Sequence, residues 1–566
     1  MQAVERFLHT PRIAYFSMEI ALRSEIPTYA GGLGVLAGDT LRTAADINLP
    51  MVAISLVSRG GYFRQHIDEQ GQQSEESEPW DPQRWATRLE AMVAVDIGGR
   101  AVWVGGWLYV LKSPVGPDQP VILLDTDLTE NHPEDRTITH FLYGGDERYR
   151  LKQEAILGIG GVRILQALGF DILEYHLNEG HSALLGVELL RRYAFSAETV
   201  RSGESPYDIH RVRNLCKFTT HTPIEAGHDK FPYSLVDEVL DEIIAKPVLR
   251  QLAGDDQLNM TRLALNLSEY VNGVARRHAE VSSRMFPGYH VRAVTNGVHP
   301  ASWTHPSVAK LFDAYLPGWS HEPEILVRVD HAISDVAIWQ AHMEAKQTLL
   351  DCVQKRTGKQ LDPQMVTLGF ARRMTEYKRP DLLFCELARL KSISSKYPIQ
   401  IVMSGKAHPH DGPGKAIIQH LHTFARDLEG VVRVVFLPEY NMDVAKLLIA
   451  GVDVWLNTPL RPLEASGTSG MKAAFNGVPN LSVLDGWWVE GCLEGITGWA
   501  IGDGPDDSND GDAQALYDKL EHVVLPLYYQ DRDGWVAVMK GAISKNASYF
   551  NSHRMMRRYA TEAYVR

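Results

Sequence analysis

Short runs of aliphatic and β-branched residues recur along this chain of 566 residues, and each is followed by a loop marked by glycine or proline and then by a helical pattern. The clearest runs lie at 51–57, 121–124, 366–370, 399–404, 431–437 and 453–457. Runs that are apolar on both faces predict strands buried between helices, as in a parallel sheet. We therefore expect an α/β fold.

The chain is longer than one hydrophobic core usually allows, so we expect two domains. Between residues 320 and 340 a polar stretch leads into a helical pattern, and a new strand begins at Val366. We predict a first domain over 1–335, a second domain over 336–545, and a helical segment over 546–566 that packs back onto the first domain.

The charge balance restricts the kind of partner. The chain has 57 lysines and arginines against 70 aspartates and glutamates, which gives a net charge of −13. Such a field repels polyanions and argues against nucleic acid as a partner. Any phosphate site must then be built locally, from clustered cations and oriented backbone amides.

Cysteine spacing and apolar segments bear on the compartment. The 4 cysteines show no CxxC spacing, which indicates free, mostly buried thiols in a reducing compartment. The histidines at 408 and 410 fit no common ligand set, so we expect no metal. Charged residues interrupt the start of the chain, and the longest apolar stretch, 155–170, is too short to cross a bilayer. We expect a cytoplasmic protein with no membrane partner.

The segment from Glu464 to Lys472 reads Glu-Ala-Ser-Gly-Thr-Ser-Gly-Met-Lys, and its small residues leave backbone amides uncovered. A helix is predicted at 471–475, so the segment presents amides and the positive end of the helix dipole to an anion. A lysine beside such a site suits a Schiff base to an aldehyde that carries a phosphate. Taken alone, the pattern is more often a structural turn.

A second segment, from Arg372 to Arg379, has four cations within eight residues. It follows the strand predicted at 366–370 and precedes a helix expected near Pro380. The carboxyl end of a strand is where open α/β sheets bind ligands, and arginine and lysine both hold phosphate. A solvated basic turn is an equally good interpretation of such a run by itself.

Loops with glycine or polar side chains complete the set. The segment 28–38 is rich in glycine and allows close backbone approach to a phosphate or sugar, although a lone loop of this kind is a weak signal. Polar islands at 177–181, 220–225 and 295–303 each follow an apolar run, so we expect them at the edge of a sheet. As isolated motifs, His181 and His221 are more often core or surface histidines.

In this order, these segments closely resemble the α-glucan (glycogen, starch, maltodextrin) phosphorylases, especially their short and divergent bacterial branch. The similarity covers nearly the whole chain, from Ala14 to Glu490, and EASGTSGMK together with EYKRP is highly specific. The resemblance implies a GT-B glycosyltransferase fold, in which two Rossmann-like domains face each other across a deep cleft. The first domain would bind glucan and phosphate, and the second would bind pyridoxal 5′-phosphate.

The resemblance also implies the reaction and its residues. An α-1,4-glucan or maltodextrin would react reversibly and with retention with inorganic phosphate to give glucose 1-phosphate, and the cofactor phosphate would shuttle a proton. Lys472 would hold the cofactor as a Schiff base and act in catalysis with Arg373, Lys378 and His221. The other residues expected at the cofactor are Thr468, Ser469, Gly470, Arg372 and Trp303. The residues expected at the substrate are Gly31, Gly32, Leu33, His221, Asn296, Tyr377, Glu464, Ser466 and Gly467.

The types of residue agree with this chemistry. Glycosidic cleavage normally needs two carboxyl groups, whereas the strongest motifs here are cationic and rich in amides. That suits inorganic phosphate as both proton donor and nucleophile. Two phosphates in contact repel strongly, so several cations must hold them together, and the segment 372–379 supplies these.

Two positions depart from the long phosphorylases. Ala21 stands where those have a tyrosine that contacts the cofactor, and Thr375 stands where they have a histidine. The chain is also far shorter, so nucleotide or phosphorylation control is not carried over. The oligomeric state stays open, with a homodimer as one option.

Two alternatives remain. A sugar-nucleotide-dependent glycosyltransferase of the same GT-B fold uses arginine and lysine on a diphosphate but has no pyridoxal phosphate, so Lys472 discriminates. A glucan-binding protein without activity is the second, and the intact set of Arg373, Lys378 and Lys472 argues against it.

Overall fold

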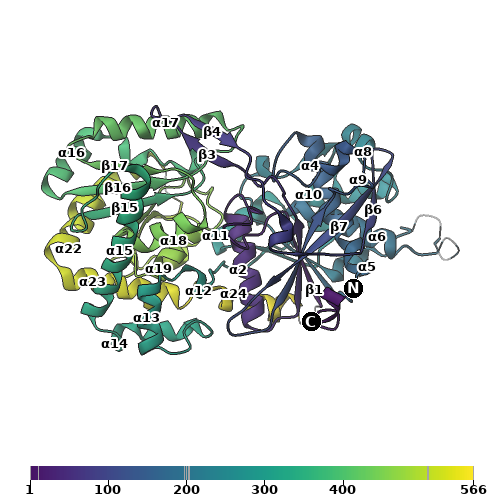
Figure 1. Ribbon diagram of the computed structural model, residues 1–566, viewed down its shortest axis with the longest axis horizontal. Coiled ribbons are helices and arrows are strands. Elements are labelled where there is room, and N and C mark those ends of the chain that lie inside the picture. Colours follow the sequence, from purple (N-terminus) through teal and green to yellow (C-terminus); the bar gives the residue numbers. More distant parts are fainter. Residues whose placement is uncertain are drawn as a thin grey trace.

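The structure is a computed structural model that describes residues 2–10, 12–196, 198, 200–201, 204–506 and 509–564. Figure 1 shows two lobes side by side, each built around its own β-sheet with helices packed on it. The purple-to-blue part of the chain forms the right-hand lobe, and the green part from α15 to α19 lies in the left-hand lobe. The α/β class predicted from the alternating runs is confirmed.

The first sheet has the strand order β14-β13-β10-β9-β1-β2-β8-β7-β5, with β6 paired to β7. Strands from β14 to β8 are parallel, while β7 is antiparallel to its neighbours. The chain begins at the central strand β1, extends to one side and later continues on the other from β9, so the loops after β1 and β9 diverge and leave a crevice. The bounds are β1 (Ile13–Ser17), β2 (Met51–Leu56), β5 (Thr87–Arg88), β6 (Val93–Ile97), β7 (Arg100–Leu111), β8 (Gln119–Asp125), β9 (Glu174–Asn178), β10 (Cys216–Thr219), β13 (Tyr270–Gly273) and β14 (Arg292–Ala293).

The second sheet is parallel throughout, in the order β17-β16-β15-β18-β19-β20. This is the order of a doubly wound α/β sheet, and its switch point lies between β15 and β18. The bounds are β15 (Val366–Ala371), β16 (Ile399–Ser404), β17 (Arg433–Leu437), β18 (Val454–Asn457), β19 (Asn480–Val483) and β20 (Gly498–Ile501).

The apolar runs found in the sequence each coincide with a parallel strand of one of the two sheets, namely β2, β8, β15, β16, β17 and β18. The helical pattern before Val366 is also confirmed, as α15 (Asp335–Thr357). Ser334 caps the first turn by accepting from the Ala337 amide, and Gly358 ends the helix with a left-handed φ of 70°. The helix expected near Pro380 begins later, as α16 (Leu387–Lys396), because a short 3-10 turn comes first.

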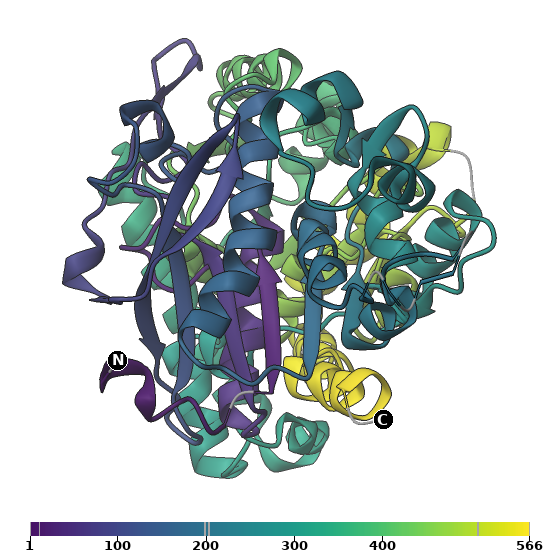
Figure 2. The same ribbon diagram turned by 90° about the vertical axis from the view of Figure 1, so that its right-hand side faces the viewer.

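The last helix returns to the first sheet. Helix α24 (Ser552–Tyr559) packs against α2 (Gly32–Asp46), and Met555, Met556 and Tyr559 join the apolar cluster of β1 and α2. Figure 2 shows this yellow segment beside the purple strands of the first sheet. The helical part of the predicted segment 546–566 is present, although residues 565 and 566 lie outside the described residues.

Two passages of the chain connect the lobes, and they run next to each other. Val298 and Asn551 form a parallel bridge, and the amides of Val298 and Ser552 donate to Phe550 and Val298 carbonyls at 3.2 and 2.9 Å. Apolar side chains between Trp303 and Phe550 pack in the apolar cluster of the second sheet. The division at residue 335 stays a prediction, and this packing favours a boundary nearer Trp303.

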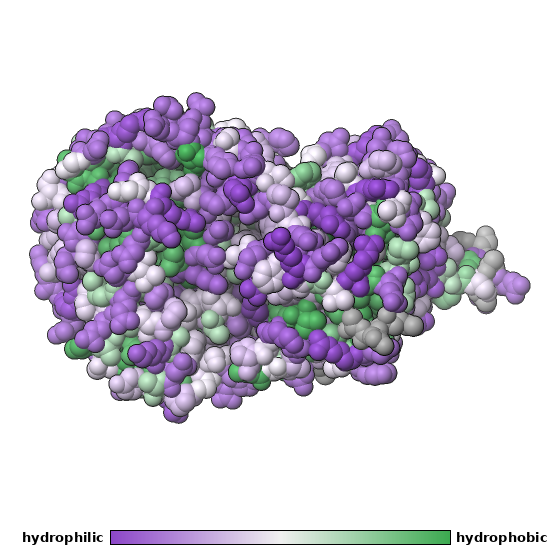
Figure 3. Space-filling model, viewed as in Figure 1, coloured by the Kyte–Doolittle hydropathy of each residue, from purple (hydrophilic) through white to green (hydrophobic). Residues whose placement is uncertain are grey.

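The surface and thiols complete the description. Figure 3 shows a mainly hydrophilic face on which hydrophobic residues are scattered in small areas. No helix in the described ranges is long and apolar enough to span a bilayer. All four cysteines are free, as expected, but only Cys216 is buried and Cys385 is exposed, so the expectation of mostly buried thiols is wrong.

Candidate active site

Both charged segments lie at the switch point of the second sheet. The segment 372–379 follows β15, and the segment from Glu464 to Lys472 follows the neighbouring strand β18. The segments are in direct contact, because Arg372 Nη2 lies 2.8 Å and Lys378 Nζ 2.6 Å from the same oxygen, Glu464 Oε2. The arrangement follows from topology, since loops at a switch point leave their strands on opposite faces and enclose a crevice.

The Glu464 carboxylate stays ionised although it is buried. Burial raises its pKa, but the charges of Arg372 and Lys378 outweigh this effect and bring the pKa to about 2. Arg372 keeps buried N–H groups at Nε and Nη1 that no acceptor among the described residues satisfies. Unpaired buried donors are uncommon, so this guanidinium is suited to an anion.

A tight turn carries Lys378 to Glu464. Residues Glu376–Lys378 form a single 3-10 turn, and Arg379 after it has a left-handed φ of 44°. The Arg379 side chain donates to the carbonyls of Thr458 and Pro459 at 2.9 and 2.8 Å, which holds the turn against the loop that follows β18. A strained residue held by several bonds is typical of a functional site.

Arg373 is exposed and forms no ion pair with a carboxylate in the described part of the chain. It lies beside Tyr377 and beside Tyr62 of the first lobe, whose pKa is raised by burial and held back by the Arg373 charge. An arginine without a carboxylate partner at the carboxyl end of a strand is placed to bind a substrate anion.

Helix α19 (Thr468–Ala474) carries Lys472 and begins three residues earlier than predicted. Thr468, Ser469 and Gly470 are therefore its first turn, where amides have no partners further along the helix, although the Gly470 amide donates to the Gly467 carbonyl at 3.3 Å. Gly467 before them has a left-handed φ of 83°. Gly470 packs so closely on Asn480 that a Cβ there would lie 2.3 Å from Oδ1.

Lys472 is a buried lysine with an aromatic neighbour. Its Nζ lies 4.1 Å from the centre of the Trp303 ring, and burial lowers its pKa to about 8. Asn476 donates from Nδ2 to the carbonyls of Trp303 at 2.8 Å and Lys472 at 3.1 Å, so one amide links the two passages. Asp39 of α2 accepts from Trp303 Nε1 at 2.7 Å. The sequence analysis did not single out Asp39 or Asn476.

The glycine-rich loop forms the start of α2. A Cβ at Gly31 or Gly32 would meet nothing within 4 Å, so this side of the loop is open. Gly34 packs tightly instead, since a Cβ there would lie 2.6 Å from Glu19 Oε2 and 2.7 Å from Tyr29 Cβ. Leu33 follows in the first turn, so the amides of Gly32 and Leu33 are suited to a ligand, whereas the Val35 amide donates to the Gly31 carbonyl at 3.1 Å.

Glu19 is a further residue that the sequence analysis did not assign. Its Oε2 accepts from the amides of Ala30 and Gly31 at 2.6 and 3.0 Å, and its Oε1 accepts from the Tyr143 hydroxyl at 2.9 Å. The carboxylate therefore ties β1, the glycine-rich loop and the loop at Tyr143 into one unit. A single acidic residue in an apolar stretch offered little signal for this role.

His221 lies at the carboxyl ends of the first sheet. Its Nε2 is 2.7 Å from Asn178 Oδ1, and its amide donates to Glu179 Oε2 at 2.7 Å. Because Asn178 donates from Nδ2 to Ser17 Oγ, its Oδ1 is the acceptor and His221 carries its proton on Nε2. Burial lowers the pKa of His221 to about 3, so the ring is neutral and Nδ1 can accept a hydrogen bond.

Other predicted sugar contacts contain buried polar atoms without partners. Asn296 Oδ1 and Ser466 Oγ accept or donate no hydrogen bond among the described residues, and the same is true of Thr375 Oγ1. The Asn296 carbonyl accepts from Arg554 Nη2 at 2.9 Å, which fixes its backbone. Asn296 and His221 both come from the first lobe, whereas Lys472 belongs to the second lobe.

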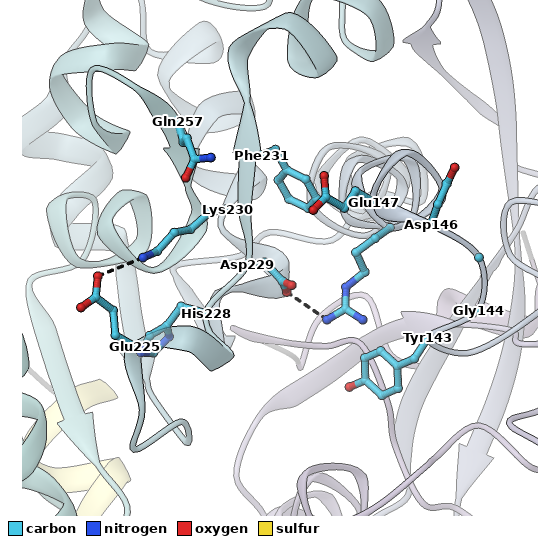
Figure 4. A pocket seen from close by; sticks show the side chains of 12 residues that line it. Tyr143, Gly144, Asp146, Glu147, Glu225, His228, Asp229, Lys230, Phe231 and Gln257 are labelled. Atoms are coloured by element: carbon cyan, nitrogen blue, oxygen red, sulfur yellow. Dashed lines mark hydrogen bonds and ion pairs between the residues drawn. The ribbon is translucent and has the colours of Figure 1, made fainter. Parts of the chain in front are cut away.

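A polar cavity of about 490 Å³ opens in the first lobe between the loops at 143–150 and 225–231. Figure 4 shows that its side chains come from both loops, with the Lys230–Glu225 pair and the Arg150–Asp229 pair each at 2.9 Å. Lys472 and Arg372 do not line this cavity. Tyr143, which does, donates to Glu19, and Glu19 in turn accepts from the Gly31 amide of the glycine-rich loop. Sequence analysis missed it because its residues are separated in the chain.

The chain is similar to known proteins along nearly its whole length. The family described as "Carbohydrate phosphorylase" matches residues 246–494. The chain is 38% identical to maltodextrin phosphorylase of Thermococcus litoralis, over 98% of this chain and 70% of the relative. It is 36% identical to glycogen phosphorylase of Aquifex aeolicus, over 98% of this chain and 86% of the relative. It is also 31% identical to an uncharacterized protein of Methanocaldococcus jannaschii, over 97% of this chain and 99% of the relative.

Proposed function

The chain belongs to the α-glucan phosphorylase family, and we propose from this that it splits α-1,4-glucans with inorganic phosphate to give glucose 1-phosphate. The observation that carries the proposal is the meeting of Arg372, Lys378 and Glu464 at the same switch point that presents the buried Lys472. Two neighbouring cationic sites suit a reaction that brings two phosphates together. Maltodextrin, glycogen and glucose 1-phosphate are the ligands we expect.

The residues around Lys472 fit pyridoxal 5′-phosphate. A buried lysine whose pKa is lowered to about 8 has a ready supply of neutral amine for an aldehyde. The Trp303 ring offers a flat surface beside this amine, and the first-turn amides of Thr468, Ser469 and Gly470 suit a phosphate. Bound there, the group would supply a phosphate with a second pKa near 6, which gives and takes protons at neutral pH.

The substrate phosphate would bind to Arg373, Lys378 and the Gly32 amide. Arg373 has no carboxylate partner in the described residues, and the Gly32 side of the loop is open. Arg372, with its unsatisfied Nε and Nη1, would hold the cofactor phosphate close to the substrate phosphate. Cations on both sides offset the repulsion between the two anions.

The transferred glucosyl unit would be held by neutral and acidic side chains. Asn296 Oδ1 and Ser466 Oγ are buried and have no hydrogen-bond partner among the described residues, and neutral His221 offers Nδ1 as an acceptor. Glu464 would accept from a sugar hydroxyl through Oε1, because its Oε2 is occupied by the two cations. Tyr377 and the Gly467 amide complete the set expected from the family.

These residues support cleavage without a carboxylic acid at the bond. Arg373 and Lys378 hold the substrate phosphate so that it gives a proton to the leaving glucan oxygen. The same cations then keep the phosphate against the positively charged glucosyl centre, which it attacks on the face that the glucan has left. Fixed charges of this kind are worth most in a crevice that excludes water.

At the level of architecture, we infer a GT-B arrangement in which the two sheets belong to Rossmann-like domains on either side of a cleft. The strand order of the second sheet and the two switch points support it. A homodimer and cytoplasmic residence stay predictions of the sequence.

One experiment tests the proposal. The purified protein is incubated with glucose 1-phosphate and maltodextrin, with and without added pyridoxal phosphate, and released phosphate is measured. We expect release that depends on both substrates, and borohydride should fix the cofactor to Lys472 in a peptide map. A protein without pyridoxal that transfers glucose from a sugar nucleotide would support the alternative glycosyltransferase and overturn the proposal.

A further inference from the structure

The carboxylate of Asp39 links helix α2 to the surroundings of Lys472. Asp39 is 1% exposed, and its Oδ2 accepts from Trp303 Nε1 at 2.7 Å and from the His299 amide at 3.2 Å. Trp303 presents its ring 4.1 Å from Lys472 Nζ. One carboxylate from the first lobe therefore fixes the aromatic surface on which the lysine nitrogen of the second lobe lies.

Trp303 is held at both ends. Its indole N–H binds Asp39, and its carbonyl accepts from Asn476, which also binds the Lys472 carbonyl. Neither the ring nor its backbone can shift without breaking one of these hydrogen bonds. The spacing of the ring and the lysine nitrogen is thus built into the fold.

The other oxygen of this carboxylate, Oδ1, does not bind Trp303. Asp39 Oδ1 is buried and accepts no hydrogen bond from any described residue. Arg42 Nη1 is 3.8 Å away, which is within ion-pair range but too far for a hydrogen bond. A buried carboxylate oxygen without a donor is uncommon in a native structure and calls for a ligand.

Charged groups from three elements face this carboxylate. Arg42 on the same helix and Lys446 on α18 (Met442–Gly451) face Asp39, together with Lys472 itself. Burial lowers the pKa of Lys472 to about 8, and the Asp39 charge is the one that opposes this fall. Arg42 also donates to the carbonyls of Ala21 and Leu22, so its own position is fixed elsewhere.

We propose that Asp39 is a positioning residue for the cofactor: it fixes Trp303, on whose ring the Lys472 nitrogen lies, through Oδ2, and its carboxylate is the counter-charge of that nitrogen. The inference rests on the proposed function, because it concerns the lysine that would carry pyridoxal phosphate. A carboxylate near the cofactor tunes the electronic state of pyridoxal, so Asp39 would favour the protonated form of the lysine-bound group.

The test compares holoenzymes of wild type, Asp39→Asn and Trp303→Phe. The asparagine can still accept from the indole but lacks the charge, whereas the phenylalanine keeps the charge and a ring but lacks the N–H group. The readout is the absorbance band of the lysine-bound cofactor, followed against pH. We expect the midpoint of Asp39→Asn to fall by about one pH unit or more, since an opposite charge at close range shifts a pKa by this amount.

Trp303→Phe should not lower the midpoint. An equal fall in Trp303→Phe and Asp39→Asn would show that ring placement, and not charge, is responsible, and it would overturn the counter-charge role. An unchanged midpoint in folded, cofactor-loaded Asp39→Asn would overturn the inference as well. If that variant does not fold, Asp39→Ser, which is also uncharged and can accept a hydrogen bond, gives the same comparison.

Different results would overturn the proposed function and the role of Asp39. A wild-type protein with no pyridoxal absorbance and no borohydride-fixed Lys472 peptide would overturn the proposed function and the role of Asp39 together. A loaded wild type with an unshifted Asp39→Asn would leave the phosphorylase function in place and remove only the role of Asp39.

Discussion

Lys378 Nζ lies 2.6 Å from Glu464 Oε2, and Arg372 Nη2 shares the same carboxylate oxygen at 2.8 Å. One buried carboxylate is thus shared by two positively charged side chains. The arrangement keeps a net positive charge for a phosphate and prevents the two cations from repelling each other when no phosphate is bound.

Replacing Glu464 by glutamine should destabilise the free protein. The change leaves two cations without a counter-charge, and breaking a buried pair costs about 3–5 kcal/mol. Because the pKa of Glu464 is lowered to about 2, its stabilising effect should be present above about pH 4.5 and be lost as pH falls towards 2. The melting temperature at pH 7 should be lower in Glu464→Gln than in wild type. Added phosphate should raise the melting temperature more in Glu464→Gln than in wild type. Glu225→Gln, at an exposed pair, is the control and should change little.

Lys472→Ala should abolish phosphorolysis, by at least about 10³-fold, while the fold stays intact. The amine is buried and burial already lowers its pKa, so its removal also removes a charge that is costly to desolvate. Phosphate release from glucose 1-phosphate and the circular dichroism spectrum are the measurements. Lys355→Ala, in the last turn of α15, is the matched surface control. Activity above a few per cent in Lys472→Ala would contradict the role of the cofactor.

Arg373→Ala should raise the KM for phosphate about tenfold or more and lower kcat by about 10²-fold, because the residue holds charge that develops in the transition state. Initial rates at varied phosphate give both constants. Arg356→Ala, an exposed arginine of α15, is expected to behave as wild type. If phosphate dependence were unchanged in Arg373→Ala, the assignment to the substrate phosphate would be wrong.

Glycines of the loop should separate into two groups. Gly31→Ala and Gly32→Ala have open space for a Cβ and should fold normally, but they should weaken phosphate binding because the loop then cannot approach the anion as closely. Gly34→Ala would place a Cβ 2.7 Å from Tyr29 Cβ and should lower the melting temperature. Expression, melting temperature and the phosphate KM distinguish the two classes. Equal stability of Gly34→Ala and Gly32→Ala would contradict this packing.

Acid should weaken the first lobe through its buried histidines. Burial lowers the pKa of His176 to about 3, so the unfolded chain binds a proton more readily below about pH 6.5. Stability is therefore complete above pH 6.5 and is lost towards pH 3, by up to about 1.4 kcal/mol per pH unit for each such histidine. The fall in melting temperature between pH 7 and pH 5 should be smaller in His176→Asn than in wild type. His66→Asn, at an exposed histidine, should show the wild-type fall.

Local patterns in the sequence were sufficient for the parallel strands, whereas the role of Lys472 depended on the resemblance to a family. A buried parallel strand needs an apolar run, so 366–370 and 399–404 could be found directly. The basic segment and the small-residue segment were each ambiguous until their order along the chain resembled a family. The start of α19 at Thr468 was missed, because serine, threonine and glycine are as common in loops as in a first helical turn.

Contacts between distant residues could not be predicted in the same way. Asp39 meets Trp303 across 264 positions, and Asn476 meets Trp303 across 173. Glu19 is one acid in an apolar stretch, and its three hydrogen bonds depend on where the loop at Tyr143 folds. These contacts depend on how the two lobes pack, and a short stretch of sequence does not predict that packing.

The bridge between Val298 and Asn551 has a mechanical consequence. Because the outgoing and returning passages are hydrogen-bonded to each other, a shift of the backbone in one passage is passed directly to the other. The bridged residue Val298 lies between Asn296 and Trp303 in the chain. A single short ribbon therefore joins the expected sugar contact to the ring beside Lys472, so a substitution in the returning passage at Asn551 would be felt at both.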